Sequence, residues 1–107
     1  MQKVDPKESL QKSRLELRKI DDRIFADVNK RMQICYQIGK IKQASNLDVT
    51  DLDQEQKNAE HNARFANESC PPEMISELTN LLIKWSKKIQ KNSLWPRAWM
   101  NSILGDA

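Results

Sequence analysis

The hydrophobic and polar positions of residues 14–42 recur in steps of three and four, the spacing that places side chains on one face of a helix. This stripe consists of Arg14, Leu17, Asp21, Ile24, Val28, Arg31, Cys35, Ile38 and Lys42. Four of these nine positions are charged, and a buried charge is costly unless it is paired. The three cations therefore point to an anion bound inside a helical assembly. The alternative is that the stripe drifts around the helix and the cations reach solvent.

The predicted helix is too long to be covered by the rest of one chain. Arg14 and Lys42 are expected to lie roughly 42 Å apart along its axis. A compact domain of this size has a radius of gyration of only about 13 Å. We therefore expect a core shared with a second copy. Arg14 and Arg31 are roughly 25 Å apart on the same axis, so both can serve one site only if Arg14 comes from the other subunit.

The remaining pattern predicts an all-α fold, because no stretch alternates Val, Ile and Thr with polar residues as a strand does. Caps, prolines and apolar spacing predict three helices, over residues 5–45, 51–67 and 72–91. The third has a broad apolar face that includes Met74, Leu78 and Leu81. Gly39 lies inside the first helix, where it marks a close approach by a ligand or a neighbouring helix, or is simply tolerated.

All 107 residues fit one domain, with a helical core at about 10–91 and an apolar tail over 92–107. Pro96 stops any continuous helix in this tail, and Trp95 and Trp99 are apolar side chains that favour docking onto the body. The tail could serve as a lid over a ligand site. A clasp across a dimer is the simpler interpretation.

Composition narrows the partners and the compartment. The net charge of +3 and the pI of about 9.0 suit a small anionic ligand as well as a nucleic acid. Cys35 and Cys70 stand without a CxxC motif, which is typical of a reducing compartment. No apolar run is long enough to span a membrane, no secretory signal is evident, and the lone His61 has no metal-ligand spacing. We expect a cytoplasmic protein without metal or cofactor.

Several polar residues of the second and third helices are candidates for a site. Asp51 caps the second helix, with Gln54 as its capping-box partner, and Glu55 falls on the inward side. Ser86 and Gln90 lie one turn apart and could face one ligand. Each has a plainer interpretation, as an N-cap or as ordinary helix surface. A basic cluster on the third helix, most simply a solvated face, contains Lys84, Lys87, Lys88 and Lys91.

The sequence resembles the all-helical, intertwined-dimer class of chorismate mutases over roughly residues 10–91. The resemblance is carried by IDDRI at 20–24, NKRMQICYQIGKIK at 29–42, VTDLDQEQ at 49–56 and LLIKWSKKIQ at 81–90. The spacing R-x16-R-x10-K-x8-D-x3-E, which starts at Arg14 and ends at Glu55, is its most specific feature. The resemblance implies three helices per chain, the first very long, in an intertwined helical-bundle homodimer.

The resemblance also implies a role for each candidate residue. Arg14, from the other subunit, and Arg31 would hold the two carboxylates of chorismate, with Ser86 near one of them. Lys42 and Gln90 would donate hydrogen bonds to the ether oxygen. The ring hydroxyl would be bound by Asp51 and Glu55.

The implied reaction, a Claisen rearrangement of chorismate to prephenate, fits these residue types. It needs no nucleophile or general base, but it needs a dianion held in a reactive conformer and positive charge at the breaking C–O bond.

One departure from the family pattern is Gln54, where many relatives have arginine, so a cation is missing close to the site. Sister activities on the same fold are isochorismate pyruvate lyase, which generally lacks the acidic pair, and mutation of an amino analogue of chorismate. The presence of Asp51 and Glu55 favours the mutase.

A non-enzymatic function is the remaining alternative. A helical dimer could bind a protein or a nucleic acid through the lysines of the third helix. Salt-dependent binding to a polyanion would support that interpretation. Such a module would not need mutually compatible positions for the four residues Arg31, Lys42, Glu55 and Gln90.

Overall fold

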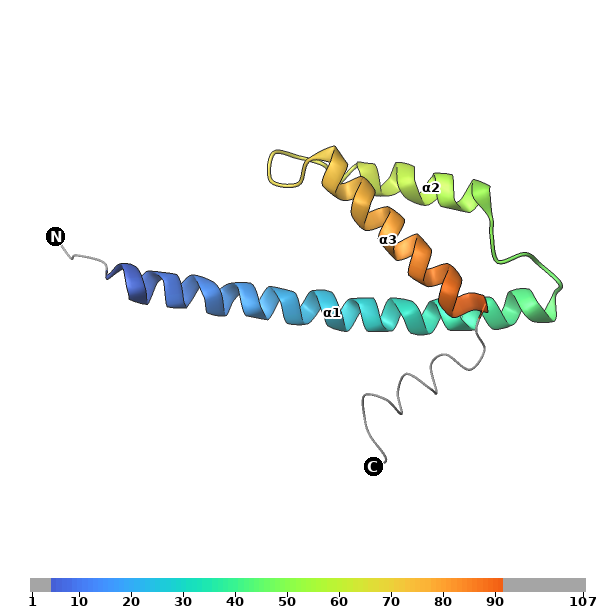
Figure 1. Ribbon diagram of the computed structural model, residues 1–107, viewed down its shortest axis with the longest axis horizontal. Coiled ribbons are helices and arrows are strands. Elements are labelled where there is room, and N and C mark those ends of the chain that lie inside the picture. Colours follow the sequence, from blue (N-terminus) through green and yellow to red (C-terminus); the bar gives the residue numbers. More distant parts are fainter. Residues whose placement is uncertain (1–4, 92–107) are drawn as a thin grey trace, which may run out of the picture. The chain divides into compact units, whose positions relative to one another are not determined.

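The computed structural model describes residues 5–91, and within this range the regular structure is entirely helical (Figure 1). The helices are α1 (Pro6–Ala44), α2 (Leu52–Ala63) and α3 (Pro72–Lys91). The predicted all-α fold with a long first helix is confirmed. The predicted tail over 92–107 lies outside the described residues. The chain divides into two compact units, Met1–Arg31 and Met32–Ala107.

The described part of the first unit is the N-terminal part of α1. The Asp5 carboxylate accepts a hydrogen bond from the N–H of Lys7 at 3.0 Å, and Pro6 takes the first helical position. This start is the one that the sequence predicts. Apolar side chains along the helix are largely uncovered in the single chain. Leu17 and Ile24, for example, are 58% and 51% exposed.

In the second unit, α1 ends where Asn46 adopts a left-handed backbone conformation with φ of 55°. The N–H of Leu47 bonds to the carbonyl of Lys42 at 2.8 Å, and the N–H of Asn46 to the carbonyl of Gln43 at 3.4 Å. This pair of bonds is a Schellman motif, for which asparagine is a suitable residue. The motif holds Lys42 in the last turn of α1, where a cation interacts favourably with the helix dipole.

Helix α2 ends earlier than the sequence predicts, at Ala63 rather than at residue 67. Beyond Ala63 the backbone makes i to i−3 bonds, such as Phe65 N–H to the Asn62 carbonyl at 3.0 Å. The Asn67 side chain then accepts hydrogen bonds from the N–H groups of Ser69 and Cys70, both at 2.9 Å. This local turn competes with continuation of the helix, which is why the predicted end is wrong.

Helix α3 contacts α2, and its polar side chains take part in that packing. Asn62 donates a hydrogen bond to the hydroxyl of Thr79 at 3.1 Å, which joins the two helices. The buried residues of α3 are Thr79, Ser86 and Ile89. By contrast, much of the predicted apolar face is exposed in the single chain, with Leu78 at 46% and Leu81 at 51%. The apolar core of the second unit is therefore small.

No helix within residues 5–91 combines the length and the apolar character that a membrane crossing requires.

Candidate functional site

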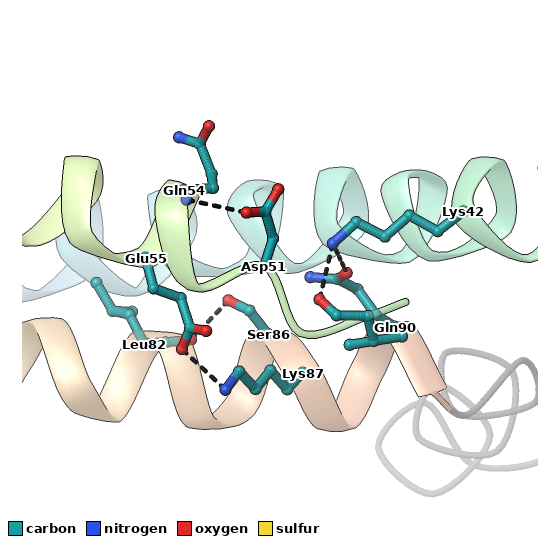
Figure 2. A network of polar contacts seen from close by, with 9 residues as sticks. Lys42, Asp51, Gln54, Glu55, Leu82, Ser86, Lys87 and Gln90 are labelled. Atoms are coloured by element: carbon teal, nitrogen blue, oxygen red, sulfur yellow. Dashed lines mark hydrogen bonds and ion pairs between the residues drawn. The ribbon is translucent and has the colours of Figure 1, made fainter. Parts of the chain in front are cut away.

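Lys42 of α1 and Gln90 of α3 lie in direct contact, although 48 residues separate them in the sequence. The Lys42 ammonium donates to the side-chain carbonyl of Gln90 at 3.0 Å and to the backbone carbonyl of Val49 at 2.8 Å (Figure 2). Both bonds are partly buried. An ammonium has three N–H donors, so these two acceptors leave one donor for a ligand. The linker after α1 and the end of α3 are thereby fixed at the same cation.

Gly39 explains how α1 and α3 come so close. A β-carbon at this position would lie 2.6 Å from the Cα and the carbonyl oxygen of Gln90. Any larger residue would therefore collide with the backbone of α3. The structure confirms the predicted close approach and identifies its cause as a neighbouring helix. Gly39 and Lys42 lie three residues apart on α1, so the helix crossing sits directly beside the Lys42–Gln90 contact.

Glu55 of α2 forms a second polar contact with α3. One of its carboxylate oxygens, Oε1, lies 2.8 Å from the ammonium of Lys87. The other, Oε2, is buried and has no hydrogen-bond partner in the described part of the chain. A buried acceptor without a donor is costly, so a group of this kind in a native structure is a place where a ligand's donor would be accommodated.

Ser86 is buried, with 6% of its surface exposed, rather than lying on the helix surface. Its hydroxyl donates to the carbonyl of Leu82 at 2.6 Å, one turn earlier in α3. In this arrangement the hydroxyl hydrogen is directed at the helix backbone. To donate to a carboxylate, as the resemblance implies, the hydroxyl would have to rotate about its C–O bond.

Asp51 is the N-cap of α2, and its carboxylate accepts from the backbone N–H of Gln54 at 3.1 Å. The predicted capping box is only half formed, because the Gln54 side chain bonds forward to Asn58 at 3.0 Å. Figure 2 shows the Gln54 side chain directed away from α3 and that of Glu55 directed toward it. In this structure Asp51 acts as an N-cap, which is the plainer of its two predicted roles.

Arg14 and Arg31 lie in the first unit, whereas the other candidate residues belong to the second. Arg14 is exposed and Arg31 is half-buried on α1. They are separated by 17 residues, which corresponds to roughly 25 Å of helix. Their participation in one site with Lys42 stays a prediction.

Two contacts were missed by the sequence reasoning. The sequence pattern groups Lys87 with the lysines of a solvated face, and it does not single out the carbonyl of Val49. Neither has a local signal, because the Glu55–Lys87 pair depends on how α2 packs on α3. The identity of Val49 does not matter to a contact made by its backbone oxygen. The partial burial of Lys87 becomes apparent only when α2 and α3 are packed together.

The described part of the second unit thus presents a cationic donor, an amide and a carboxylate, one oxygen of which has no donor within that part. Such groups bind and polarise an oxygen-rich anionic ligand through hydrogen bonds and charge.

Neither Cys35, which is buried, nor Cys70 is joined in a disulfide. Among the described residues no group of three or more His, Cys, Asp or Glu side chains is arranged to hold a metal ion.

Comparison with known protein families identifies a family for this chain. The family model for chorismate mutase type II matches residues 13–91, a range that includes all the candidate site residues. Neither the curated proteins nor the solved structures give a significant match to the chain. The family match covers well over half of the sequence and extends through all three helices. The chain belongs to the chorismate mutase type II family.

Proposed function

We propose that the chain is a chorismate mutase, an isomerase that converts chorismate to prephenate. Membership of the family supports this activity class. The observation that carries the proposal is the contact between Lys42 and Gln90, at 3.0 Å, which joins two donors from different helices. In the rearrangement the ether C–O bond breaks as a new C–C bond forms within the same molecule, and electron density develops on the ether oxygen.

Lys42 and Gln90 are the proposed donors to that ether oxygen. The carbonyl of Gln90 is occupied by Lys42, which orients the amide so that its NH₂ group serves as a donor. The remaining N–H of Lys42 adds a positive charge at the developing negative charge. Donors fixed before the reaction need no reorganisation in the transition state. The bond from Lys42 to Val49 restricts the ammonium further.

The two carboxylates of the substrate are assigned to Arg14 and Arg31, with Ser86 beside one of them. A guanidinium matches a carboxylate with two parallel hydrogen bonds, so two arginines suit a dianion. Holding both carboxylates restricts the substrate to the compact conformer from which the rearrangement occurs. The ring hydroxyl is assigned to Glu55 and Asp51, because the buried Oε2 of Glu55 has no donor among the residues that the structure describes.

A homodimer is part of the proposal, with Arg14 contributed by the partner subunit. Apolar residues are exposed in the single chain in both units, including Leu17 and Ile24 in the first and Leu78 and Leu81 in the second. Exposed apolar surface of this extent favours association. A second copy of the chain would cover it and complete the site. A cytoplasmic location, where chorismate would be available, stays an expectation.

The direct test is chorismate loss by ultraviolet absorbance, with the products separated by chromatography. Prephenate formation by the purified protein supports the proposal. Pyruvate release from isochorismate, without turnover of chorismate, would instead assign the lyase activity. Turnover of only the amino analogue would assign the sister mutase. Inertness toward all three compounds would contradict the proposal and favour a binding module.

The binding module has less support from the contacts of its predicted surface. Lys87 is paired with Glu55, and the ammonium of Lys88 lies 4.4 Å from the centre of the Trp85 ring. Two of the four lysines of the basic cluster are thus engaged within the chain, which leaves less charge for a polyanion.

A further inference from the structure

Lys87 makes a contact that the proposed mechanism does not use. Its ammonium lies 2.8 Å from Oε1 of Glu55, and the two side chains are only 30% and 23% exposed. Lys84, one turn earlier on the same helix, is by comparison exposed. The Glu55–Lys87 pair is thus partly removed from solvent, where opposite charges interact more strongly than on an open surface.

The geometry of Glu55 indicates what the pair does. Lys87 occupies one carboxylate oxygen, and the second, buried oxygen has no partner among residues 5–91. Without the lysine, a half-buried carboxylate would gain hydration by turning toward solvent, which removes Oε2 from its buried position. The attraction of Lys87 opposes that rotation. A carboxylate held at one oxygen presents the other in a fixed direction.

We propose that Lys87 is a positioning residue, which holds Glu55 so that its Oε2 accepts the hydrogen bond of the substrate's ring hydroxyl. This inference rests on the proposed function and adds a residue to its site. Lys87 acts through Glu55 and has no assigned contact with the reacting atoms. Its role requires a long cationic side chain at this place on α3, so arginine should substitute for it better than any neutral residue.

The experiment compares kcat and KM for prephenate formation in the full-length wild type and in Lys87→Met, Lys87→Arg and Lys84→Met. We expect Lys87→Met to lower kcat/KM by roughly 10-fold, since small misplacements of a binding group are costly. Lys87→Arg should recover most of the loss. Lys84→Met makes the same change of charge one turn away and should match the wild type. Lys87→Gln replaces Lys87→Met if that variant fails to fold, as judged by circular dichroism.

A double-mutant cycle separates positioning from a general structural role. In a Glu55→Gln background, Lys87→Met should change kcat/KM by less than about twofold, because its effect passes through the Glu55 carboxylate. Thermal unfolding of each variant is measured in parallel. A structural role of Lys87 that does not pass through Glu55 would reduce activity equally in both backgrounds. A role of the ion pair in helix packing alone would lower the unfolding temperature and leave the kcat/KM of the folded protein unchanged.

Two outcomes would overturn the inference alone. In both, the wild type forms prephenate. In the first, Lys87→Met has the same kcat/KM as Lys84→Met. In the second, Lys87→Met lowers kcat/KM as much in the Glu55→Gln background as in the wild type. A wild-type protein that is inert toward chorismate, isochorismate and the amino analogue would overturn the proposed function and this inference with it.

Discussion

A β-carbon on Gly39 would lie 2.6 Å from both the Cα and the carbonyl oxygen of Gln90. These are backbone atoms, so they cannot move aside as the end of a flexible side chain would. The side chain of the same Gln90 accepts a hydrogen bond from Lys42 at 3.0 Å. The helix crossing at Gly39 therefore sets the spacing of α1 and α3 at the two residues that we propose to act on the ether oxygen.

Gly39→Ala should lower activity far more than stability. The added methyl group must displace α3, and a shift of about 1 Å at a positioned donor can lower the rate as much as 100-fold. Overpacking destabilises by about 1–3 kcal/mol, but alanine in a helix returns about 1 kcal/mol relative to glycine. Steady-state kinetics and thermal unfolding measure the two effects. Gln37→Ala, at an exposed position of α1, is the control, and wild-type kcat/KM in Gly39→Ala would contradict the proposed spacing role.

Gln54→Arg should improve substrate affinity. The Gln54 side chain is exposed and bonds forward to Asn58, so within residues 5–91 its replacement disturbs no buried contact. An arginine there adds a cation near a site for a dianion, which should lower KM roughly three- to fivefold. Gln56→Arg is a matched control, because Gln56 makes the same type of bond to Glu60, at 3.1 Å. If both variants lower KM equally, the effect is one of net charge and the local explanation fails.

Mixing two inactive variants tests whether Arg14 acts across subunits. Arg14→Ala and Lys42→Ala homodimers should each lack activity. In a heterodimer, one site would combine the intact Lys42 of one chain with the intact Arg14 of the other. After denaturation and refolding of an equal mixture, roughly a quarter of wild-type activity should return. Half of the dimers should be heterodimers, and one of the two sites in each heterodimer should be complete. No recovery from a mixture that sizing shows to be dimeric would place Arg14 in its own subunit's site.

Thr79→Val should affect stability without affecting catalysis. Thr79 is buried, and its hydroxyl accepts the hydrogen bond from Asn62 that joins α2 to α3. Valine has nearly the same shape but leaves the Asn62 amide without this acceptor, at a cost of about 1 kcal/mol. Chemical denaturation should reveal the loss. The kcat of the folded variant should equal that of the wild type, and a large drop in kcat would mean that Thr79 belongs to the site.

The sequence predicts the helix ends well where the signal is local. Asp5 and Pro6 begin α1, Asn46 ends it and Pro72 begins α3, each through a backbone preference of the residue itself. The end of α2 differs from the prediction, because the Asn67 side chain forms a turn with residues 69 and 70. Composition does not distinguish that turn from one more turn of helix.

The candidate site was predictable in part. The position of Gly39 inside a helix indicates a close approach, and the resemblance implies that Lys42 and Gln90 lie near the same ligand oxygen. Their direct contact is a finding of the structure. The pairing of Glu55 with Lys87 was not predictable, because it joins two helices whose packing has no local sequence signal. The burial of Ser86 was also missed. The apolar pattern of α3 predicts burial of the face that carries Leu78 and Leu81, not of Ser86. That apolar face is exposed in the single chain, and the proposed second copy would cover it.

Removal of the Lys42 ammonium most directly tests the central claim, which is that this ammonium acts on the ether oxygen of chorismate. Prephenate formation is measured for the wild type, for Lys42→Ala and for Lys40→Ala, which removes an exposed lysine from the same turn of α1. Loss of one donor at a developing oxyanion lowers kcat by about 100- to 1,000-fold, whereas loss of the Val49 and Gln90 contacts leaves a folded helical protein. The account predicts that loss in Lys42→Ala and near wild-type activity in Lys40→Ala. A folded Lys42→Ala protein with wild-type turnover would contradict it.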